Sequence, residues 1–276
     1  MEIRQAIGPN EAQKFDSESL RAHFLVQHLV QPNRLRTIYS HHDRMIIGAA
    51  LPIVQKLELP TYPNLKADFF LQRREMGIIN LGGNGVISAD DQTFDLANLD
   101  CLYLGKGTER VTLRSNDIAD PAVFFLLSTP AHQAHPTRHL TKEAAAPAQM
   151  GAASTANERT IYKYIHQLGI QSCQLVMGLT ILAPGSVWNT MPAHVHDRRM
   201  EAYFYFDLAP EHRVFHFMGQ PQQTRHLVVG NHEAVISPPW SIHSGCGTAS
   251  YGFVWGMAGE NRDFADMDLV PVPELK

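Results

Sequence analysis

One short segment concentrates the side chains that could bind a metal ion. The run PAHVHDRRMEAYFYF (residues 192–206) contains His194 and His196, one residue apart, and Glu201 five residues after the second histidine. On a β-strand, residues two apart project from the same face, so both imidazoles can bind one ion. An offset of five residues cannot stay on that face. We therefore expect a turn or bulge within DRRM, before Glu201.

A fourth candidate ligand, His243, lies in the segment PPWSIHSG (238–245), whose prolines and small residues are typical of a loop that enters a strand. Three imidazoles and a carboxylate suit Zn, Fe, Mn, Ni or Cu, and geometry rather than ligand type selects among these metals. An H-x-H pair alone is a weak signal, because structural or surface histidines explain most such pairs. The addition of Glu201 and His243 makes a metal site the favoured prediction.

The composition limits the class of protein. With 276 residues, 44% of them hydrophobic and 18% charged, the chain is typical of a soluble globular protein with one large domain or two smaller ones. A net charge of −4 gives no reason to expect nucleic acid or an anionic membrane as partner. The N-terminal residues have no apolar core of a signal peptide, and no window resembles a spanning helix. The three cysteines do not suggest a disulfide framework, and we expect a cytoplasmic protein.

Strand signals dominate the chain, as short apolar or alternating runs separated by Gly, Pro, Asn and Asp. We expect strands at 44–52, 68–82, 85–90, 100–105, 110–115, 122–129, 172–182, 201–208, 213–219, 225–230, 233–238 and 250–257. The helix candidates are short and lie at 10–15, 18–29 and 141–149. This pattern predicts a mainly all-β chain built from antiparallel sandwiches or barrels.

The two parts of the chain also resemble each other. QRREMGIINLGGNG (72–85) and DRRMEAYFYFDL (197–208) both place an arginine pair and a glutamate just before a strand. LGKGTER (104–110) sits where SPPWSIHSG (237–245) sits in the second half. We therefore predict two copies of one β-sandwich: an N-terminal half over 1–140, a connector over 141–160 rich in small residues, and a C-terminal half over 161–276 that holds the metal.

Several longer segments resemble a known family. H-x-H followed by Glu, with a later histidine behind a proline-containing turn, resembles the two motifs of the cupin superfamily, although Trp240 stands where cupins commonly have glycine. More specifically, the chain resembles the 5-keto-4-deoxyuronate isomerase family, also called 4-deoxy-L-threo-5-hexosulose-uronate ketol-isomerases. The segments that carry this resemblance are YSHHDRMIIG, FFLQRREMGIINLGGNG, LYLGKG, LTILAPGSVWNTMPAHVHDRRMEAYFYF, HFMGQPQQTRH, ISPPWSIHSG and FVWGMAGEN.

The resemblance implies a fold and a cofactor. It implies a duplicated cupin with two jelly-roll halves and one Zn²⁺ per subunit, with His194, His196, Glu201 and His243 as ligands. The first half fits a copy without metal, because DFFLQRRE contains no histidine and Thr108, Glu109 or Arg110 falls where His243 would be. Glu75 remains there, but one carboxylate is not a transition-metal site. We expect this half to serve packing and assembly, and the family resemblance suggests a hexameric homo-oligomer.

The resemblance also implies a reaction. It predicts an aldose–ketose isomerase that converts 5-dehydro-4-deoxy-D-glucuronate to 3-deoxy-D-glycero-2,5-hexodiulosonate in pectin breakdown, through an enediol intermediate. The general base stays open among Glu201, Lys163 and His226. The substrate carboxylate calls for a forked guanidinium, and Arg198, Arg199 and Arg225 are near the metal motif in sequence. Of these we single out Arg199.

Two other functions use the same ligands. An iron-dependent cupin oxygenase would need three imidazoles and a carboxylate as well, and predicts oxygen uptake. A non-catalytic cupin that binds sugar acids would use the metal to hold the fold, and predicts unfolding that is strongly coupled to metal removal. Isomerisation requires neither oxygen uptake nor a redox-active metal.

Overall fold

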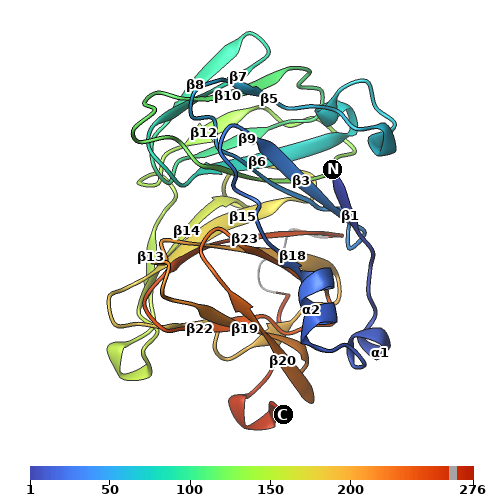
Figure 1. The fold of residues 1–276 in the computed structure, drawn as a ribbon, viewed down its shortest axis with the longest axis vertical. Coiled ribbons are helices and arrows are strands. Elements are labelled where there is room, and N and C mark those ends of the chain that lie inside the picture. The colour runs from blue at the N-terminus through green and yellow to red at the C-terminus, as the bar shows by residue number, and fades with distance from the viewer. Residues whose placement is uncertain (261–265) are drawn as a thin grey trace.

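The computed structural model describes residues 1–260 and 266–276 and consists of two β-sandwiches stacked along the long axis of the molecule (Figure 1). Each sandwich has one seven-stranded and one four-stranded sheet. The prediction of a mainly β chain with a few short helices is confirmed. Within the described residues, every helix is too short to cross a membrane.

The first sandwich is formed mostly by the first half of the chain. Its large sheet has the order β1 (Glu2–Arg4), β3 (Leu35–Ser40), β4 (Ile46–Ala50), β11 (Phe124–Pro130), β6 (Arg74–Asn80), β9 (Cys101–Leu104) and β12 (Arg138–Leu140). Its small sheet has the order β5 (Leu57–Glu58), β10 (Val111–Ser115), β7 (Gly85–Ala89) and β8 (Gln92–Leu96).

The second sandwich repeats this arrangement. Its large sheet has the order β13 (Ala148–Met150), β14 (Arg159–Ile165), β15 (Val176–Leu182), β23 (Gly252–Gly259), β18 (Arg199–Phe206), β21 (Ala234–Ser237) and β2 (Leu25–Val26). Its small sheet has the order β16 (Trp188–Asn189), β22 (Ser244–Gly247), β19 (Val214–Gln220) and β20 (Gln223–Val229), and β17 (His194–Val195) pairs with β24 (Asp268–Leu269). The two sandwiches have the same number of strands in each sheet, but the edge strand β1 pairs with β3 in parallel, whereas β13 pairs with β14 in antiparallel.

The helices are short. Two sequence expectations, one of a helix and one of a strand, need correction. The helices are α1 (Pro9–Ala12) and α2 (Ser17–Phe24), with 3₁₀ turns η1 (Pro63–Leu65), η2 (Phe70–Arg73), η3 (Ala153–Thr155) and η4 (Val272–Glu274). The helix expected at 141–149 is wrong: turns precede β13, because Pro147 lacks the N–H that a helix interior needs. The strand expected over 68–82 begins only at Arg74, after η2.

Two segments belong to the second sandwich, although the predicted division places them outside the C-terminal half. The N-terminal strand β2 pairs with β21, so it adds an edge strand to the second sandwich, and α2 contacts β20 and β21 (Figure 1). Residues 148–150, within the expected connector, form β13 and pair with β14. The division at residues 140 and 160 therefore stays a prediction. The N-terminal segment crosses between the sandwiches, since β1 belongs to the first and β2 to the second.

The two large sheets face each other, and a shared apolar core joins the halves. Ile79, Phe125 and Leu127 of the first half are buried in one cluster with Met200 and Phe204 of the second. The rings of Phe125 and Phe204 stack with centroids 4.3 Å apart. Because side chains alternate along a strand, the other face of each large sheet must line the interior of its own sandwich.

Candidate metal centre

Four side chains converge inside the second sandwich. One donor atom from each of His194, His196, Glu201 and His243 lies within 4.8 Å of the others, and all four residues are buried. The Glu201 Oε2 atom is 3.1 Å from His196 Nε2 and 3.0 Å from His243 Nε2. His243 Nε2 is 2.8 Å from His194 Nε2. The sequence prediction that these four residues come together is confirmed.

Local structure explains how one short run supplies three of these groups. His194 lies on β17, which pairs with the C-terminal strand β24, and a turn at residues 197–198 leads into β18. The turn that the five-residue offset required is therefore present. On β18 the side chains alternate, so Met200 and Ala202 face the shared core while Glu201 faces the sandwich interior. His243 comes from the loop between β21 and β22.

The Nδ1 atoms of His196 and His243 point away from the cluster, and their hydrogen bonds orient the two rings. His196 donates from Nδ1 to the carbonyl oxygen of Arg199 at 2.8 Å. A carbonyl can only accept, so Nδ1 carries a proton, and Nε2 faces the Glu201 carboxylate, where it would have to be deprotonated to bind a metal. His243 Nδ1 is 3.3 Å from Ser237 Oγ, and Ser237 pairs with Glu201 across β18 and β21. Such outer partners fix the tautomer of metal-binding histidines.

The electrostatics of the cluster keep His194 neutral and Glu201 ionised. Burial and, to a smaller extent, the neighbouring His243 lower the pKa of His194 to about 3, so this imidazole is neutral near pH 7. Burial raises the pKa of Glu201, but the charge and hydrogen bonds of His243 and His196 outweigh it and hold that pKa well below its usual range. Burial lowers the pKa of His196, and Glu201 more than reverses this shift. A carboxylate is thus held ionised among imidazoles.

The donor set fits a transition metal. For metal–nitrogen distances of about 2.0–2.1 Å, a tetrahedral site has donor–donor edges of roughly 3.3 Å. Three of the six donor–donor distances lie between 2.8 and 3.1 Å, slightly below that value, and all four donor atoms lie within 4.8 Å of one another. A buried carboxylate needs compensating charge, and a divalent ion bound among the three imidazoles would supply it. Small outward movements of the imidazoles would accommodate such an ion.

A cavity of about 290 Å³ opens beside the cluster. Its lining includes His194 and Glu201 and the aromatic and thioether side chains of Phe253, Trp255 and Met257. Two arginines also line it, Arg159 from the start of β14 and Arg199 from the start of β18. The cavity therefore joins the candidate metal ligands to cationic groups.

Only some of the predicted catalytic residues line this cavity. Glu201 and Arg199 line it, and Arg199 Nη2 is 2.7 Å from Asp266 Oδ1. Lys163 lies on the same face of β14 as Arg159, but it is not among the lining residues. His226 is exposed, and its ring contacts Phe215 rather than the cluster. The structure does not bring His226 to the cavity.

The other two arginines considered from the sequence make contacts elsewhere. Arg198 is on the turn before β18, is exposed, and pairs with Glu260 at 2.6 Å. Arg225 binds the carbonyl oxygens of Gln13 and Phe15, next to the N-terminal helices. Both positions explain why proximity in sequence to the metal motif is a poor guide to proximity in space.

Two cavity residues were missed or undervalued by sequence reasoning. Arg159 was missed because the strand over 159–165 was not expected, although alternating Arg159, Ile161 and Lys163 could have indicated it. Tyr203 is not among the site residues predicted from the sequence. Its hydroxyl is 3.2 Å from that of Thr190, and its ring centroid is 5.6 Å from that of His243. Burial raises the pKa of Tyr203, and the charge of Glu201 raises it further, so the hydroxyl stays protonated.

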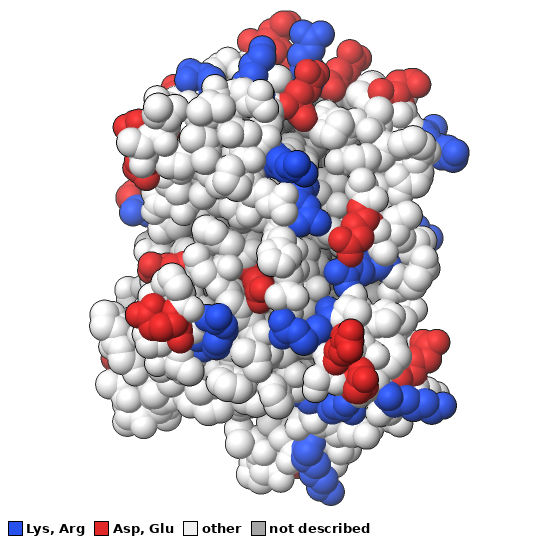
Figure 2. Space-filling view, viewed as in Figure 1, with Lys and Arg blue, Asp and Glu red and all other residues white. Residues whose placement is uncertain are grey.

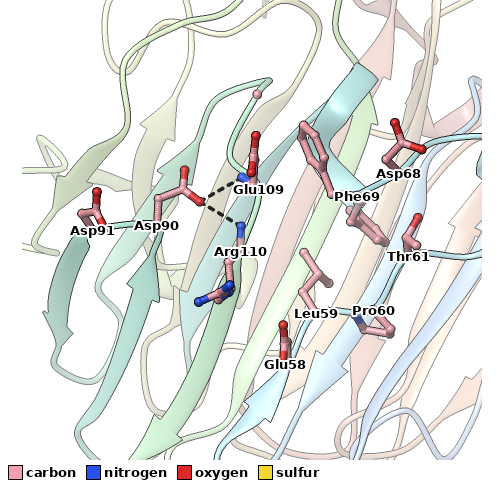
Figure 3. A pocket seen from close by; sticks show the side chains of 12 residues that line it. Glu58, Leu59, Pro60, Thr61, Asp68, Phe69, Asp90, Asp91, Glu109 and Arg110 are labelled. Carbon is pink, nitrogen blue, oxygen red and sulfur yellow. Dashed lines mark hydrogen bonds between the residues drawn. The ribbon is translucent and has the colours of Figure 1, made fainter.

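The first sandwich has a cavity of a different kind. A cavity of about 850 Å³ there is lined by Glu58, Asp68, Asp90, Asp91, Glu109 and Arg110 among others (Figure 3). Asp90 Oδ1 accepts hydrogen bonds from the backbone N–H groups of Glu109 and Arg110, at 3.0 and 2.8 Å. The loop that was aligned with His243 thus lies at this cavity, where its backbone binds a carboxylate instead of a side chain binding a metal.

Charged side chains of both signs are interspersed over the face of the molecule shown in Figure 2, and wide areas of that face carry neither. The cavity beside the candidate metal ligands is lined by the buried Arg199 and the half-buried Arg159.

Solved structures with a similar fold define the class of protein. An IolB-like protein from Salmonella typhimurium has a TM-score of 0.65 and 16% identity, with 82% of this chain and 87% of that chain covered. An oxalate decarboxylase from Lactobacillus farciminis has a TM-score of 0.58 and 9% identity, with 86% and 83% covered. At these identities the likeness shows the fold alone, which is that of a duplicated cupin.

Sequence relatives are more specific. The model of the KduI/IolB family matches residues 24–270, and the chain belongs to this family. A 4-deoxy-L-threo-5-hexosulose-uronate ketol-isomerase from Shouchella clausii is 52% identical over 276 residues, and one from Bacillus subtilis is 50% identical, each with full coverage of both chains. These relatives are ketol-isomerases, which are intramolecular oxidoreductases.

Proposed function

We propose that the protein is a metal-dependent ketol-isomerase that converts 5-dehydro-4-deoxy-D-glucuronate (4-deoxy-L-threo-5-hexosulose uronate) to 3-deoxy-D-glycero-2,5-hexodiulosonate. The observation that carries the proposal is the buried cluster of three histidines and one glutamate beside a cavity with two arginines, in a chain half identical to ketol-isomerases along its whole length. The proposal includes pectin and uronate catabolism as its setting, Zn²⁺ at one ion per subunit, a cytoplasmic location and a homo-oligomer, with the hexamer as the form that family resemblance suggests.

The reaction moves hydrogen between two adjacent carbons. A hydroxymethine carbon beside an aldehyde loses a proton, the electrons pass to the carbonyl oxygen, and reprotonation at the former aldehyde carbon gives a ketone and a hydroxymethyl group. The intermediate enediol needs its developing oxygen charge stabilised. A divalent ion held by His194, His196, Glu201 and His243 supplies Lewis-acid polarisation of the carbonyl when it is bound.

The chain's own residues supply binding and proton transfer. Glu201 lies at the cavity and is one candidate for the base, and Lys163 is a second. The hydroxyl of Tyr203 faces the same cavity and stays protonated, so it can donate a hydrogen bond to a substrate oxygen as negative charge develops there. The apolar wall of Phe253, Trp255 and Met257 excludes water from the reacting carbons.

Arg159 is the guanidinium that we propose for the substrate carboxylate. Its Nη1 donates to the carbonyl oxygen of Asn157 at 2.8 Å, which leaves further N–H groups of the fork for a ligand. Arg199, the sequence prediction, is also at the cavity, but its charge is already compensated by Asp266 at 2.7 Å. A cavity of about 290 Å³ is at the lower end of typical small-molecule sites and suits a six-carbon acid.

Metal removal and restoration test the proposal. Purified protein is analysed for metal content, assayed for interconversion of the hexosulose uronate, treated with a chelator, and reconstituted with Zn²⁺ while oxygen consumption is followed. We expect near-stoichiometric metal, loss of turnover on chelation, and recovery with Zn²⁺ without oxygen uptake. Oxygen consumption with bound iron would support the oxygenase instead. Tight binding of the sugar acid without turnover would support the non-catalytic cupin. Turnover that persists without metal would overturn the metal-dependent mechanism.

A further inference from the structure

The turn between β3 and β4 of the first half reaches the metal-bearing strand of the second. Asp43 is in this turn, and its Oδ2 atom accepts a hydrogen bond from the backbone N–H of Met200 at 2.7 Å. Met200 lies on β18 between the cavity residues Arg199 and Glu201. A side chain 157 positions away in sequence therefore contacts the strand that carries one candidate ligand.

The hydrogen bond from Met200 is one end of a longer connection. The N–H of Met200 and the carbonyl of Arg199 belong to the same peptide group, and that carbonyl accepts the Nδ1–H of His196 at 2.8 Å. The Asp43 carboxylate, the 199–200 peptide and the His196 imidazole therefore form one chain of hydrogen bonds that ends at the ligand atom Nε2. Metal-binding histidines commonly donate their other N–H to a carboxylate or a carbonyl. Here the peptide group that carries the carbonyl also donates its N–H to the carboxylate of Asp43.

The turn holds Asp43 in this position at a conformational cost. Asp43 and Arg44 both have positive φ, 45° and 53°, a region that residues other than glycine rarely adopt. Such backbone persists when surrounding contacts determine it. Here Ser40 N–H binds Met45 O at 2.8 Å, and the Arg44 carbonyl accepts from Arg74 at 2.6 Å. Burial also raises the pKa of the Asp43 carboxyl, and the hydrogen bond from Met200 opposes this shift.

We propose that Asp43 is a positioning residue for the metal centre, and that through the 199–200 peptide it orients His196 and strengthens this ligand. The inference rests on the metal centre of the proposed function. An N–H that donates to a carboxylate makes its own carbonyl a better acceptor, because hydrogen bonds in a chain polarise one another. The first half then contributes to the chemistry as well as to packing and assembly, although it holds no ligand.

The test uses full-length Asp43→Asn and Asp43→Ala, with Tyr164→Phe as a matched control. Tyr164 donates from its hydroxyl to the carbonyl of Leu99 at 2.5 Å, so Tyr164→Phe also removes a buried hydrogen bond between the halves, but not one to the metal centre. For each protein, three quantities are measured: the Kd for Zn²⁺ by competition with a chromophoric chelator, the visible absorption of the Co²⁺-loaded protein, and the unfolding temperature without metal.

We expect the Kd to weaken about tenfold or more in Asp43→Ala, within the range seen when outer partners of metal ligands are removed. Asp43→Asn keeps an acceptor oxygen and should weaken the Kd by a smaller factor, with a shifted Co²⁺ spectrum in both variants. Tyr164→Phe should lower the unfolding temperature while its Kd stays within twofold of wild type. A wild-type Kd and spectrum in Asp43→Ala would overturn this inference alone. A wild type that binds no stoichiometric metal would overturn the proposed function with it.

Discussion

The interiors of the two sandwiches differ although their strands have the same order. The first interior is mainly apolar, with Met76, Ile78 and Leu126 in its cluster, and its buried Arg74 is hydrogen-bonded to Ser128. The second places buried polar groups at the same depth, including Glu201, Tyr203 and His216. An apolar core needs no partner for its side chains, whereas every buried polar group must be hydrogen-bonded or bind a ligand. The interior of the first sandwich therefore serves mainly packing, whereas the interior of the second contains the candidate site.

The two glutamates that follow the arginine pairs show how this difference arises. Counting from the buried arginine that begins each strand, Glu75 is one residue after Arg74 on β6, while Glu201 is two residues after Arg199 on β18. A shift of one position moves a strand side chain to the opposite face. Glu201 therefore points into its sandwich, and Glu75 points to the interface between the halves.

At that interface Glu75 binds backbone and hydroxyl donors. Its carboxylate accepts from the N–H groups of Cys173, Gln174 and Leu175, at 2.7–2.9 Å, and from the hydroxyls of Tyr103 and Thr129 at 2.8 and 3.1 Å. The glutamate expected to be a remnant of a lost metal site is thus a contact that joins the two halves.

The largest effect is expected for His196→Ala. Loss of one imidazole from a four-ligand site removes the metal and with it the charge stabilisation of the enediol, so kcat should fall on the order of a thousandfold or more. Metal content and turnover are measured together, with His132→Ala, an exposed histidine of the first half, as control. Retention of both metal and turnover in His196→Ala would contradict the assignment of the site.

Glu75→Gln should separate stability from metal binding. A neutral amide in place of a carboxylate that accepts five hydrogen bonds leaves buried donors unpaired, so we expect a loss of about 3 kcal/mol in unfolding free energy. Urea denaturation measures it, and the exposed Glu109→Gln should stay within about 0.5 kcal/mol of wild type. Metal content per folded molecule should not change. A loss below about 1 kcal/mol would argue against Glu75 as a joining contact.

Arg159→Met should weaken substrate binding specifically. Loss of charge-assisted hydrogen bonds to the substrate carboxylate is worth about 1.5–3 kcal/mol, or roughly 10- to 100-fold in kcat/KM. Arg159→Lys should lose less, since it keeps the charge but not the fork. Steady-state kinetics distinguish these variants from Arg198→Met, which changes an exposed residue paired with Glu260. A larger loss in Arg199→Met than in Arg159→Met would favour the sequence prediction of Arg199.

The smallest effect concerns the acid sensitivity of the second interior. Burial lowers the pKa of His216 to about 3, from an unfolded value near 6.5. Between these values the unfolded chain binds more protons, so stability falls as pH drops below about 6.5. His216 should account for about 2 kcal/mol of the loss between pH 8 and pH 5.

Metal-free His216→Gln should therefore lose less stability than metal-free wild type over this range, even though it starts from a lower value at pH 8. Urea denaturation at both pH values gives the difference, and His132→Gln should follow the wild-type pH dependence. An unchanged slope in His216→Gln would show that this histidine is not the group that responds to acid.

The sequence by itself identified the four residues of the buried cluster and the mainly β character of the chain. Both depend on short spacings: His194, His196 and Glu201 lie within eight residues, and alternation along a strand is a local property. The turn before Glu201 could be predicted because a five-residue offset is incompatible with a continuous strand. The helix expected at 141–149 failed because local composition did not outweigh the effect of Pro147.

Only the tertiary structure decided which residues surround the site. Arg159 reaches the cavity because β14 lies two strands from β23, which pairs with β18, and His226 does not because it lies on the exposed side of the small sheet. The contacts of Asp43 with Met200 and of Glu75 with residues 173–175 join positions about 100 to 160 apart. Such contacts depend on how two sheets pack against each other, and no spacing within a short window encodes that geometry.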